Sequence, residues 1–225
     1  MSLKILALET STTACSAALS IDGEVLERYV IAPREHAILI LPMIESLLVE
    51  ADLSVTQLDA VAFGRGPGSF TGVRIGAGVV QGIAFAADLP VVPVSTLAAL
   101  ALGAMGETGE GRVMTALDAR RSEVYWGCYL QDMQGMPALQ GEECVCRPAT
   151  VPLPEAGGWI GAGSGWDAYG TIMMPVAGRQ ILRMLPDIEP RAADVARLGV
   201  DGFGKGLIVS ADAAVPVYIR DTVVG

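Results

Sequence analysis

Residues 4–31 read KILALETSTTACSAALSIDGEVLERYVI. The segment contains three apolar runs of strand length: Lys4 to Leu8, Cys15 to Ile21 and Val25 to Ile31. A polar, hydroxyl-rich turn from Glu9 to Thr13 separates the first run from the second. Asp22-Gly23, between the second and third runs, is a strong hairpin signal. The chain is therefore predicted to open as a three-stranded meander with a polar turn after its first strand.

The chain continues as alternating helices and strands. We predict a helix at His36 to Asp52, a strand at Leu58 to Phe63, a helix ending near Ala87, a strand at Leu89 to Pro93 and a helix at Ser95 to Ala104, with Ser95 as its N-cap. The order βββαβαβα predicts an α/β fold class. The glycine-rich stretch from Gly103 to Gly111 is interpreted as a flexible join, which divides the chain into domains 1–105 and 106–225.

The second half repeats part of the first. Strands are predicted at Arg112 to Leu117 and Val124 to Leu130, around a polar turn that begins at Asp118. A further strand is predicted at Trp159 to Gly165, and Pro216 to Arg220 is predicted to be an extended tail. We expect a helix at 191–202 to pack back on the first domain.

Composition and charge exclude several classes of function. The 225 residues are 52% hydrophobic, which argues against intrinsic disorder. Fifteen Lys and Arg against 25 Asp and Glu give a net charge of -10 with no basic run, so the chain alone is a poor nucleic-acid binder. The single histidine, His36, excludes metal sites built from several histidines.

Cysteine spacing and hydropathy indicate the cellular compartment of the chain. The cysteines at 15, 128, 144 and 146 match no secreted disulfide framework, and Cys144-Val145-Cys146 lacks the partner pair of a zinc site. Neither a signal peptide nor a membrane span is predicted, since Arg74, Gln81 and several glycines interrupt the most apolar stretch. We expect free thiols in a reducing cytoplasm.

The helix at 36–52 carries two apolar stripes. One is formed by Ile40, Leu41, Ile44, Leu48 and Ala51, and the other by Leu39, Met43 and Leu47. One stripe can cover the sheet, and a second one left exposed marks a partner surface. The alternative is that both stripes belong to the core of this chain. Pro42 is expected to kink the helix or to mark its effective start.

The loop from Gly64 to Gly72 reads GRGPGSFTG and matches neither a P-loop, a dinucleotide fingerprint nor a hydrolase elbow. The helix that follows contains two pairs of glycines that are four residues apart, Gly72 with Gly76 and Gly78 with Gly82. This spacing allows another helix to approach closely. Ser69 or Thr71 can cap this helix, and its free N–H groups could bind an anion with help from Arg65 and Arg74. The alternative is a capped structural helix without a ligand.

Glu9 and Asp118 each follow an apolar strand, where a two-lobed ATPase orients Mg²⁺–ATP. Arg120 and the lack of glycine after Asp118 argue against phosphate binding there. The glycines from Gly161 to Gly165 are compatible with an adenosine site or with a plain turn. An ATP-dependent kinase or ATPase that uses Glu9 and Asp118 stays an alternative function, whereas a peptidase lacks a nucleophile–base pair.

Several segments resemble the TsaB (YeaZ) family of proteins needed for threonylcarbamoyladenosine formation on tRNA. They are LALETS at 6–11, Arg34-Glu35-His36 with Leu41-Pro42-Met43-Ile44, GPGSFTGVRIG at 66–76, DARRSEVY at 118–125 and PVYIR at 216–220. The resemblance spans nearly the whole chain and is loosest between 130 and 200. It departs from the family at Gln81, where a basic residue is usual.

The resemblance implies an ASKHA fold (actin/Hsp70-like, RNase H-like) with two lobes, the second reduced. It implies a non-catalytic scaffold with no catalytic residue, no metal site and no cofactor of its own, since ATP is used by partner subunits. The implied partners are TsaD, which transfers the threonylcarbamoyl group to the adenosine next to the anticodon, and the ATPase TsaE. The resemblance further implies a homodimer when the chain is alone, contact with tRNA only through the complex, and no membrane association.

The family pairs through the first two helices of its first lobe, here about 36–52 and 71–87. The resemblance thus places a partner or dimer interface at His36, Leu39, Met43, Leu47, Gly72, Ile75, Gly76 and Val79. The candidate vestigial nucleotide or phosphate region consists of Glu9, Thr10, Ser11, Asp118 and Arg120.

Overall fold

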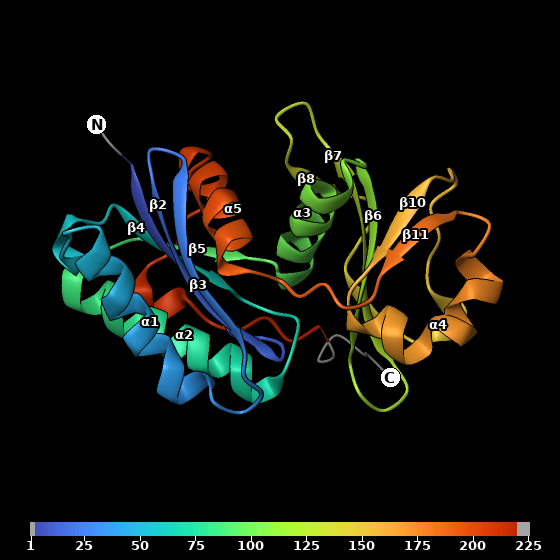
Figure 1. Cartoon of the computed structure of the whole chain (residues 1–225), viewed down its shortest axis with the longest axis horizontal. Helices are drawn as coiled ribbons and strands as arrows, with labels where there is room; N and C mark the ends of the chain where they lie inside the picture. The colour runs from blue at the N-terminus through green and yellow to red at the C-terminus, as the bar shows by residue number, and fades with distance from the viewer. Residues whose placement is uncertain (1–2, 220–225) are drawn as a thin grey trace. The chain divides into compact units, whose positions relative to one another are not determined.

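The computed structural model describes residues 3–219, which form two compact α/β units (Figure 1). The first unit comprises the chain up to Ala99 together with Pro190–Val217. The second unit begins at Leu100, ends at Glu189 and takes in Tyr218 and Ile219. Each unit is built around its own sheet.

The sheet of the first unit has the order β3-β2-β1-β4-β5. Its strands are β1 (Lys4–Glu9), β2 (Ala14–Ile21), β3 (Glu24–Ile31), β4 (Ala60–Gly64) and β5 (Val91–Val94). The first three are antiparallel, which confirms the predicted meander, and β4 and β5 continue the sheet parallel to β1. Asp22 and Gly23 have φ of 52° and 89°, as a tight hairpin turn requires.

Helices cover both faces of this sheet. They are α1 (His36–Glu50), α2 (Phe70–Ala87) and α5 (Ala192–Gly204), with the short 3-10 turns η1 (Val55–Gln57) and η3 (Ala211–Ala213). Leu6 and Leu8 of β1 join the core beneath α1 and α2, whereas Ile5 and Ala7 join the core beneath α5. This alternation follows from the two-residue repeat of a strand, so β1 is buried on both faces. Pro42 lies inside α1 and does not mark its start.

Side-chain contacts fix α5 on the first unit. At its beginning, Ala192 N donates to Ser16 Oγ at 2.9 Å and Ala193 N donates to Glu27 Oε1 at 3.0 Å. Further along, a Cβ on Gly199 would lie 2.7 Å from Ala62 Cβ, so the glycine allows α5 to approach the sheet closely. The segment that follows the second unit in sequence therefore completes the first.

The sheet of the second unit has the order β11-β10-β6-β7-β8, and β9 also pairs with β7. Its elements are β6 (Arg112–Asp118), β7 (Val124–Gln131), β8 (Pro137–Leu139), β9 (Cys144–Cys146), η2 (Pro148–Thr150), β10 (Trp159–Ala162), α4 (Ser164–Ala177) and β11 (Ile181–Leu185). Trp126 and Trp166 lie with ring centroids 5.8 Å apart in its core, which also contains Trp159 and Met173.

The unit boundary differs from the predicted division into 1–105 and 106–225 in two respects. Helix α3 (Thr96–Thr108) continues through Gly103 and Gly106, so the predicted flexible join is wrong over most of its length. Buried Ala101, Ala104 and Met105 maintain the packing of α3 through these glycines. In addition, residues 190–217 return to the first unit.

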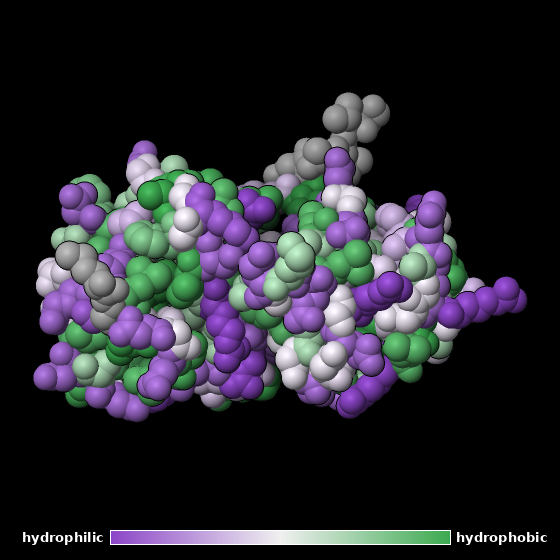
Figure 2. All heavy atoms as spheres, turned by 90° about the horizontal axis from the view of Figure 1, so that it is seen from above, coloured by the Kyte–Doolittle hydropathy of each residue, from purple (hydrophilic) through white to green (hydrophobic). Residues whose placement is uncertain are grey.

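Among the helices of residues 3–219, α2 is long enough and apolar enough to cross a membrane, judged by length and composition only. Its residues Ala77, Val80 and Ala84 pack in the core of the first unit, as in a helix that covers a sheet. Figure 2 shows a face of the molecule on which hydrophobic residues lie between groups of hydrophilic ones. Apolar residues scattered among polar ones on the surface, as on this face, are normal for a folded chain.

Candidate functional site

The carboxylate of Glu9 is completely buried at the end of β1. Its Oε1 accepts hydrogen bonds from the backbone N–H of Ser11, at 2.7 Å, and from the Ser11 hydroxyl. Its Oε2 accepts one from the Thr96 hydroxyl at 3.3 Å. Burial raises the pKa of Glu9, and the bonds from Ser11 and Thr96 oppose that shift. A Cβ on Gly64 would lie 2.6 Å from Glu9 Cδ, so only glycine fits beside this carboxylate.

The next two residues, Thr10 and Ser11, pack against the loop and the beginning of α2. The Thr10 hydroxyl donates to Gly72 O at 2.8 Å, and Ser69 N donates to Ser11 O at 2.7 Å. A Cβ on Gly68 would lie 2.7 Å from Ser11 Cβ, and one on Gly76 would lie 2.7 Å from Thr10 Oγ1. The chain's own turn thus occupies the space next to these glycines. We call Glu9, Thr10 and Ser11 with Gly64, Gly68, Gly72 and Gly76 the closed turn.

The expectation that another helix packs closely against the glycines of α2 is wrong at the closed turn. Gly72 and Gly76 are buried against Thr10 of the same chain and do not lie on an exposed helix face. Their spacing does permit a close approach, but by a turn and not by another helix. Gly78 and Gly82, in contrast, have no heavy atom within 4 Å of an added Cβ and are exposed.

Asp118 ends β6 and is bound by residues of its own hairpin and of α4. Its Oδ1 accepts hydrogen bonds from Arg120 N at 2.8 Å and from the Tyr169 hydroxyl at 3.1 Å, and its Oδ2 pairs with Arg120 Nη1 at 3.0 Å. Arg120, Arg121 and Ser122 have φ of 62°, 54° and 59°. Three consecutive non-glycine residues in the left-handed region are costly, and sequence patterns gave no sign of them. The two carboxylates of the kinase alternative are thus both engaged by neighbouring residues.

The predicted interface residues of α1 differ in exposure. His36 is buried, with Nε2 3.0 Å from Ala14 O, and Leu47 is fully buried, so the expectation that Leu47 belongs to an exposed stripe is wrong. Leu39 and Met43 are half-buried. Leu41 was predicted to share a buried stripe with Ile40 and Ile44, but it is 55% exposed.

On α2, Ile75 and Val79 are half-buried. The most exposed apolar side chains of the two helices were not predicted from the sequence: Ile38 and Val49 on α1 and Phe70 and Phe85 on α2. The half-buried Leu39, Met43, Ile75 and Val79 also pack against the core of the first unit. We call the exposed Ile38, Leu41 and Phe85, together with the half-buried Leu39, Met43, Ile75 and Val79, the α1–α2 apolar surface.

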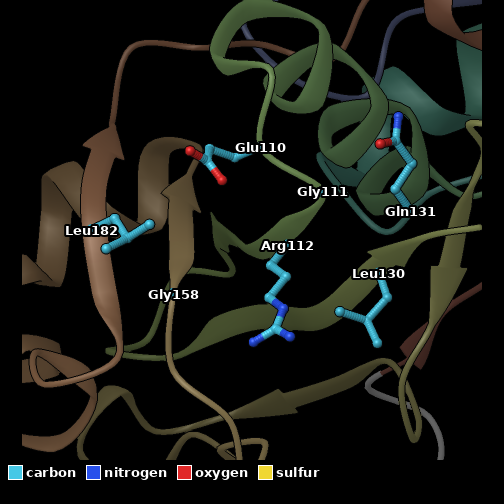
Figure 3. Close-up of a pocket in the computed structure, with 7 residues that line it drawn as sticks. All are labelled: Glu110, Gly111, Arg112, Leu130, Gln131, Gly158 and Leu182. Carbon is cyan, nitrogen blue, oxygen red and sulfur yellow. The ribbon is translucent and has the colours of Figure 1, made fainter.

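The second unit contains a cavity of about 510 Å³, and Figure 3 shows the residues that line it. It is lined by Glu110, Gly111, Arg112, Leu130, Gln131, Gly158 and Leu182. Arg112 Nη1 already donates to Gly157 O at 2.6 Å, and the side chains of Glu110 and Arg112 point in different directions. Because catalysis and tight binding need convergent polar groups, this cavity is a weak candidate for an active site. Across residues 3–219, no group of three or more His, Cys, Asp or Glu could hold a metal ion.

Comparison with known proteins identifies the family. A family model described as "TsaD: tRNA N6-adenosine threonylcarbamoyltransferase" matches residues 29–164. The chain is 41% identical over 227 residues to the "tRNA threonylcarbamoyladenosine biosynthesis protein TsaB" of Escherichia coli (strain K12), with 98% of this chain and 96% of the relative covered. The protein of the same name from Haemophilus influenzae (strain ATCC 51907 / DSM 11121 / KW20 / Rd) is 37% identical, with coverage of 98% and 95%.

The chain belongs to the TsaB family.

A solved structure agrees with this assignment. "YeaZ from Pseudomonas aeruginosa" superposes with a TM-score of 0.89 at 46% identity and covers 96% of this chain and 99% of that one. Together with the TsaD-type family model, this similarity confirms the predicted α/β fold class of ASKHA type. The TsaB-like segments 6–11 and 66–76 meet in the closed turn, whereas the segment 118–125 forms the strained hairpin of the second unit. Arg220, in the segment 216–220, lies outside the described residues.

Proposed function

We propose that this chain is a non-catalytic scaffold subunit of tRNA threonylcarbamoyladenosine biosynthesis that binds and supports the catalytic subunit TsaD. The pathway comes from the name of its TsaB relatives, which it matches over nearly its full length. The closed turn is the structural observation that supports the scaffold role. Glu9 stands where a related kinase would place a catalytic or metal-binding carboxylate, but here it is buried and hydrogen-bonded.

A buried carboxylate of this kind is poorly suited to metal or phosphate chemistry. A Mg²⁺ ligand must offer its oxygens to the ion, yet Glu9 is completely buried, and its Oε1 accepts two hydrogen bonds and its Oε2 one from the chain itself. A phosphate at the beginning of α2 needs free backbone N–H groups and space, and the turn at Thr10 and Ser11 packs against Gly68 and Gly72 there. The proposal accordingly assigns no cofactor to this chain and leaves the use of ATP to partner subunits such as TsaE.

The α1–α2 apolar surface is the proposed contact for TsaD. Ile38 is 73% exposed and Phe85 is 85% exposed, and Leu41 lies one helical turn from Ile38 on α1. Burying such side chains against a partner gains about 1.5–3 kcal/mol for each large apolar residue. In the absence of TsaD, the same surface is proposed to pair two copies of this chain in a homodimer. tRNA is contacted only within the complex, as the net charge of -10 favours.

Co-purification with TsaD tests the proposal. The wild-type chain is expected to elute with TsaD, and Ile38→Asp and Leu41→Asp are each expected to weaken the complex by tenfold or more, since about 1.4 kcal/mol corresponds to a factor of ten. The matched control is Ile172→Asp on α4, because Ile172 is 47% exposed and Leu41 is 55% exposed. Light scattering of the chain alone should give a dimer for the wild type and for the control.

Normal TsaD binding by Ile38→Asp and Leu41→Asp, or a strict monomer at tens of micromolar, would contradict the proposed surface. Calorimetry of the isolated chain with Mg²⁺–ATP tests the kinase or ATPase alternative. Micromolar binding with turnover, abolished by Glu9→Gln or Asp118→Asn, would replace the scaffold proposal.

A further inference from the structure

The hairpin that joins β6 to β7 holds a strained backbone at exposed arginines. Arg120, Arg121 and Ser122 lie in the left-handed region, with φ of 62°, 54° and 59°, and all three are exposed. A hydrogen bond from Glu123 N to Arg120 O at 3.1 Å closes the turn. Left-handed backbone is costly at residues other than glycine, and strain of this kind gathers at functional sites. The side chains at the tip of this hairpin are therefore candidates for a function.

A third arginine stands beside the hairpin. Strand β9 pairs antiparallel with β7, and the register sets Cys146 opposite Val124. Arg147 has extended backbone, with φ of -73° and ψ of 141°, so it continues β9 to the level of Glu123. Because neighbouring strands lie about 4.8 Å apart, Arg147 and the tip of the hairpin belong to one surface. We call Arg120, Arg121 and Arg147 the hairpin arginines.

The hairpin arginines differ in what they contact. Arg120 pairs with Asp118 through Nη1 and Oδ2 at 3.0 Å, yet its side chain is 85% exposed. The side chains of Arg121 and Arg147 are exposed and form no ion pair or hydrogen bond with any other residue of the range 3–219. Their guanidinium groups are thus open to a ligand. A guanidinium matches a phosphate or a carboxylate with two parallel hydrogen bonds.

The local charge favours a phosphate ligand. The hairpin and Arg147 together carry three arginines and two carboxylates, Asp118 and Glu123, which gives a charge of +1 in a chain whose net charge is -10. The carboxylate of Asp118 is also bound by α4, since its Oδ1 accepts a hydrogen bond from the Tyr169 hydroxyl at 3.1 Å. A local excess of arginine on an acidic chain is suited to neutralising the phosphates of a polyanion.

We propose that the hairpin arginines contact the phosphate backbone of tRNA when this chain is part of the modification complex. The inference rests on the proposed function, which supplies tRNA as the polyanion and TsaD as the subunit that brings the chain to it. Arg121 and Arg147 bind phosphate oxygens, and Arg120 adds positive charge while it stays paired with Asp118. The contact positions the RNA and reads no sequence, because it reaches phosphates and not base edges.

The test measures tRNA binding to the complex of TsaD with the full chain, by fluorescence anisotropy at about 0.05–0.2 M salt. Each phosphate contact releases counterions, so its loss lowers the slope of log K against log salt by about 0.7–0.9. At about 0.15 M salt this change corresponds to a four- to fivefold loss of affinity. We expect that loss for Arg121→Gln and for Arg147→Gln, with the slope reduced in both.

Arg179→Gln is the matched control in the same unit. Arg179 is exposed, and its side chain likewise has no ion pair or hydrogen bond with another residue of the described range. It follows the end of α4, whereas the beginning of α4 lies next to the hairpin, where Asp118 N donates to Ser164 Oγ at 3.3 Å. We expect this variant to bind tRNA with the affinity and the salt slope of the wild type.

Arg121→Gly separates the arginine's charge from the strain of its backbone. Glycine relaxes a residue with a φ of 54°, so this variant should resist urea better than the wild type. It should nevertheless bind tRNA as weakly as Arg121→Gln does. A side chain with only a structural role would not combine higher stability with weaker binding. Far-UV circular dichroism verifies that each variant is folded before binding is compared.

Light scattering of the complex with TsaD, recorded first, separates the outcomes. Unchanged tRNA affinity for Arg121→Gln and Arg147→Gln in a fully assembled complex would overturn this inference and leave the proposed function intact. Weaker binding of TsaD or TsaE with unchanged tRNA affinity would also overturn it, and would assign the arginines to an acidic protein surface. If the wild-type chain bound no TsaD, the proposed function would fail and this inference with it, because the hairpin reaches tRNA only in the complex.

Discussion

Replacement of Gly72 by alanine tests the closed turn. An added Cβ at Gly72 would overlap the carbonyl oxygen of Thr10 and lie 3.1 Å from its carbonyl carbon and 3.3 Å from Ser11 Cα. These are backbone atoms of a fully buried turn, so the turn or the helix must shift. Overpacking of this kind costs about 1–3 kcal/mol. The shift would also strain the hydrogen bond from the Thr10 hydroxyl to Gly72 O.

Gly78→Ala on the same helix is the matched control. Nothing lies within 4 Å of an added Cβ at Gly78, so alanine only improves helix propensity there, by about 0.5–1 kcal/mol. The same propensity gain partly offsets the overlap at Gly72. We therefore expect Gly72→Ala to lower the free energy of unfolding by about 1–2 kcal/mol and Gly78→Ala to raise it by about 0.5–1 kcal/mol.

Urea unfolding followed by far-UV circular dichroism measures both changes. All three tryptophans lie in the second unit, so their fluorescence in the same samples reports on that unit alone. For Gly72→Ala, the unfolding midpoint followed by dichroism should fall, and the midpoint followed by fluorescence should stay unchanged. If Gly72→Ala stabilised the chain as much as Gly78→Ala does, the closed turn would be refuted.

Two further predictions concern strain and pH. Arg121 has a φ of 54°, so Arg121→Gly should raise the free energy of unfolding by about 1 kcal/mol, measured by urea unfolding. If the free energy of unfolding fell by the same amount, the hairpin would not be strained at this residue. Because the pKa of Glu9 is raised in the folded state, the folded chain holds its proton more tightly than the unfolded chain. The contribution of Glu9 to stability is then present below the unfolded value of 4.5 and is lost as the pH rises through the folded pKa. Thermal unfolding across that range should show a steeper decline for the wild type than for Glu9→Gln, and parallel curves would argue against a raised pKa.

Local sequence signals were sufficient for the strands and α-helices of the first unit, but not for its two short 3-10 turns. The Asp22-Gly23 turn and the apolar runs beside it define the meander, and the apolar repeat defines α1. Elements of the second unit were missed where such signals are weak. Strand β9 has only three residues, and α4 begins directly after Gly163 and contains Pro175. The attachment of α5 depends on contacts with Ser16 and Glu27, more than 150 residues away in sequence, so periodicity could not establish it.

The candidate site was predictable in its residues but not in its environment. Glu9, Thr10 and Ser11 were predicted to form one region with Asp118 and Arg120, whereas the structure packs Thr10 and Ser11 against the glycine loop and the beginning of α2. Their spacing could not reveal that Thr10 occupies the space beside Gly72 and Gly76, because that contact joins segments 62 residues apart. The exposure of Leu41 and the burial of Leu47 depend on how α1 is rotated on the sheet, which two adjacent apolar stripes leave undefined.

In the proposed function, the chain supports the tRNA modification through partner binding and not through chemistry of its own. This role is tested most directly by reconstituting threonylcarbamoyladenosine formation with TsaD and the other pathway components, and adding this chain as wild type, as Ile38→Asp/Leu41→Asp or as Glu9→Gln/Asp118→Asn. We predict full activity with the wild type and with the carboxylate variant, and loss of activity with the surface variant. Loss of activity with the carboxylate variant, while its binding to TsaD is retained, would mean that the chain contributes chemistry of its own.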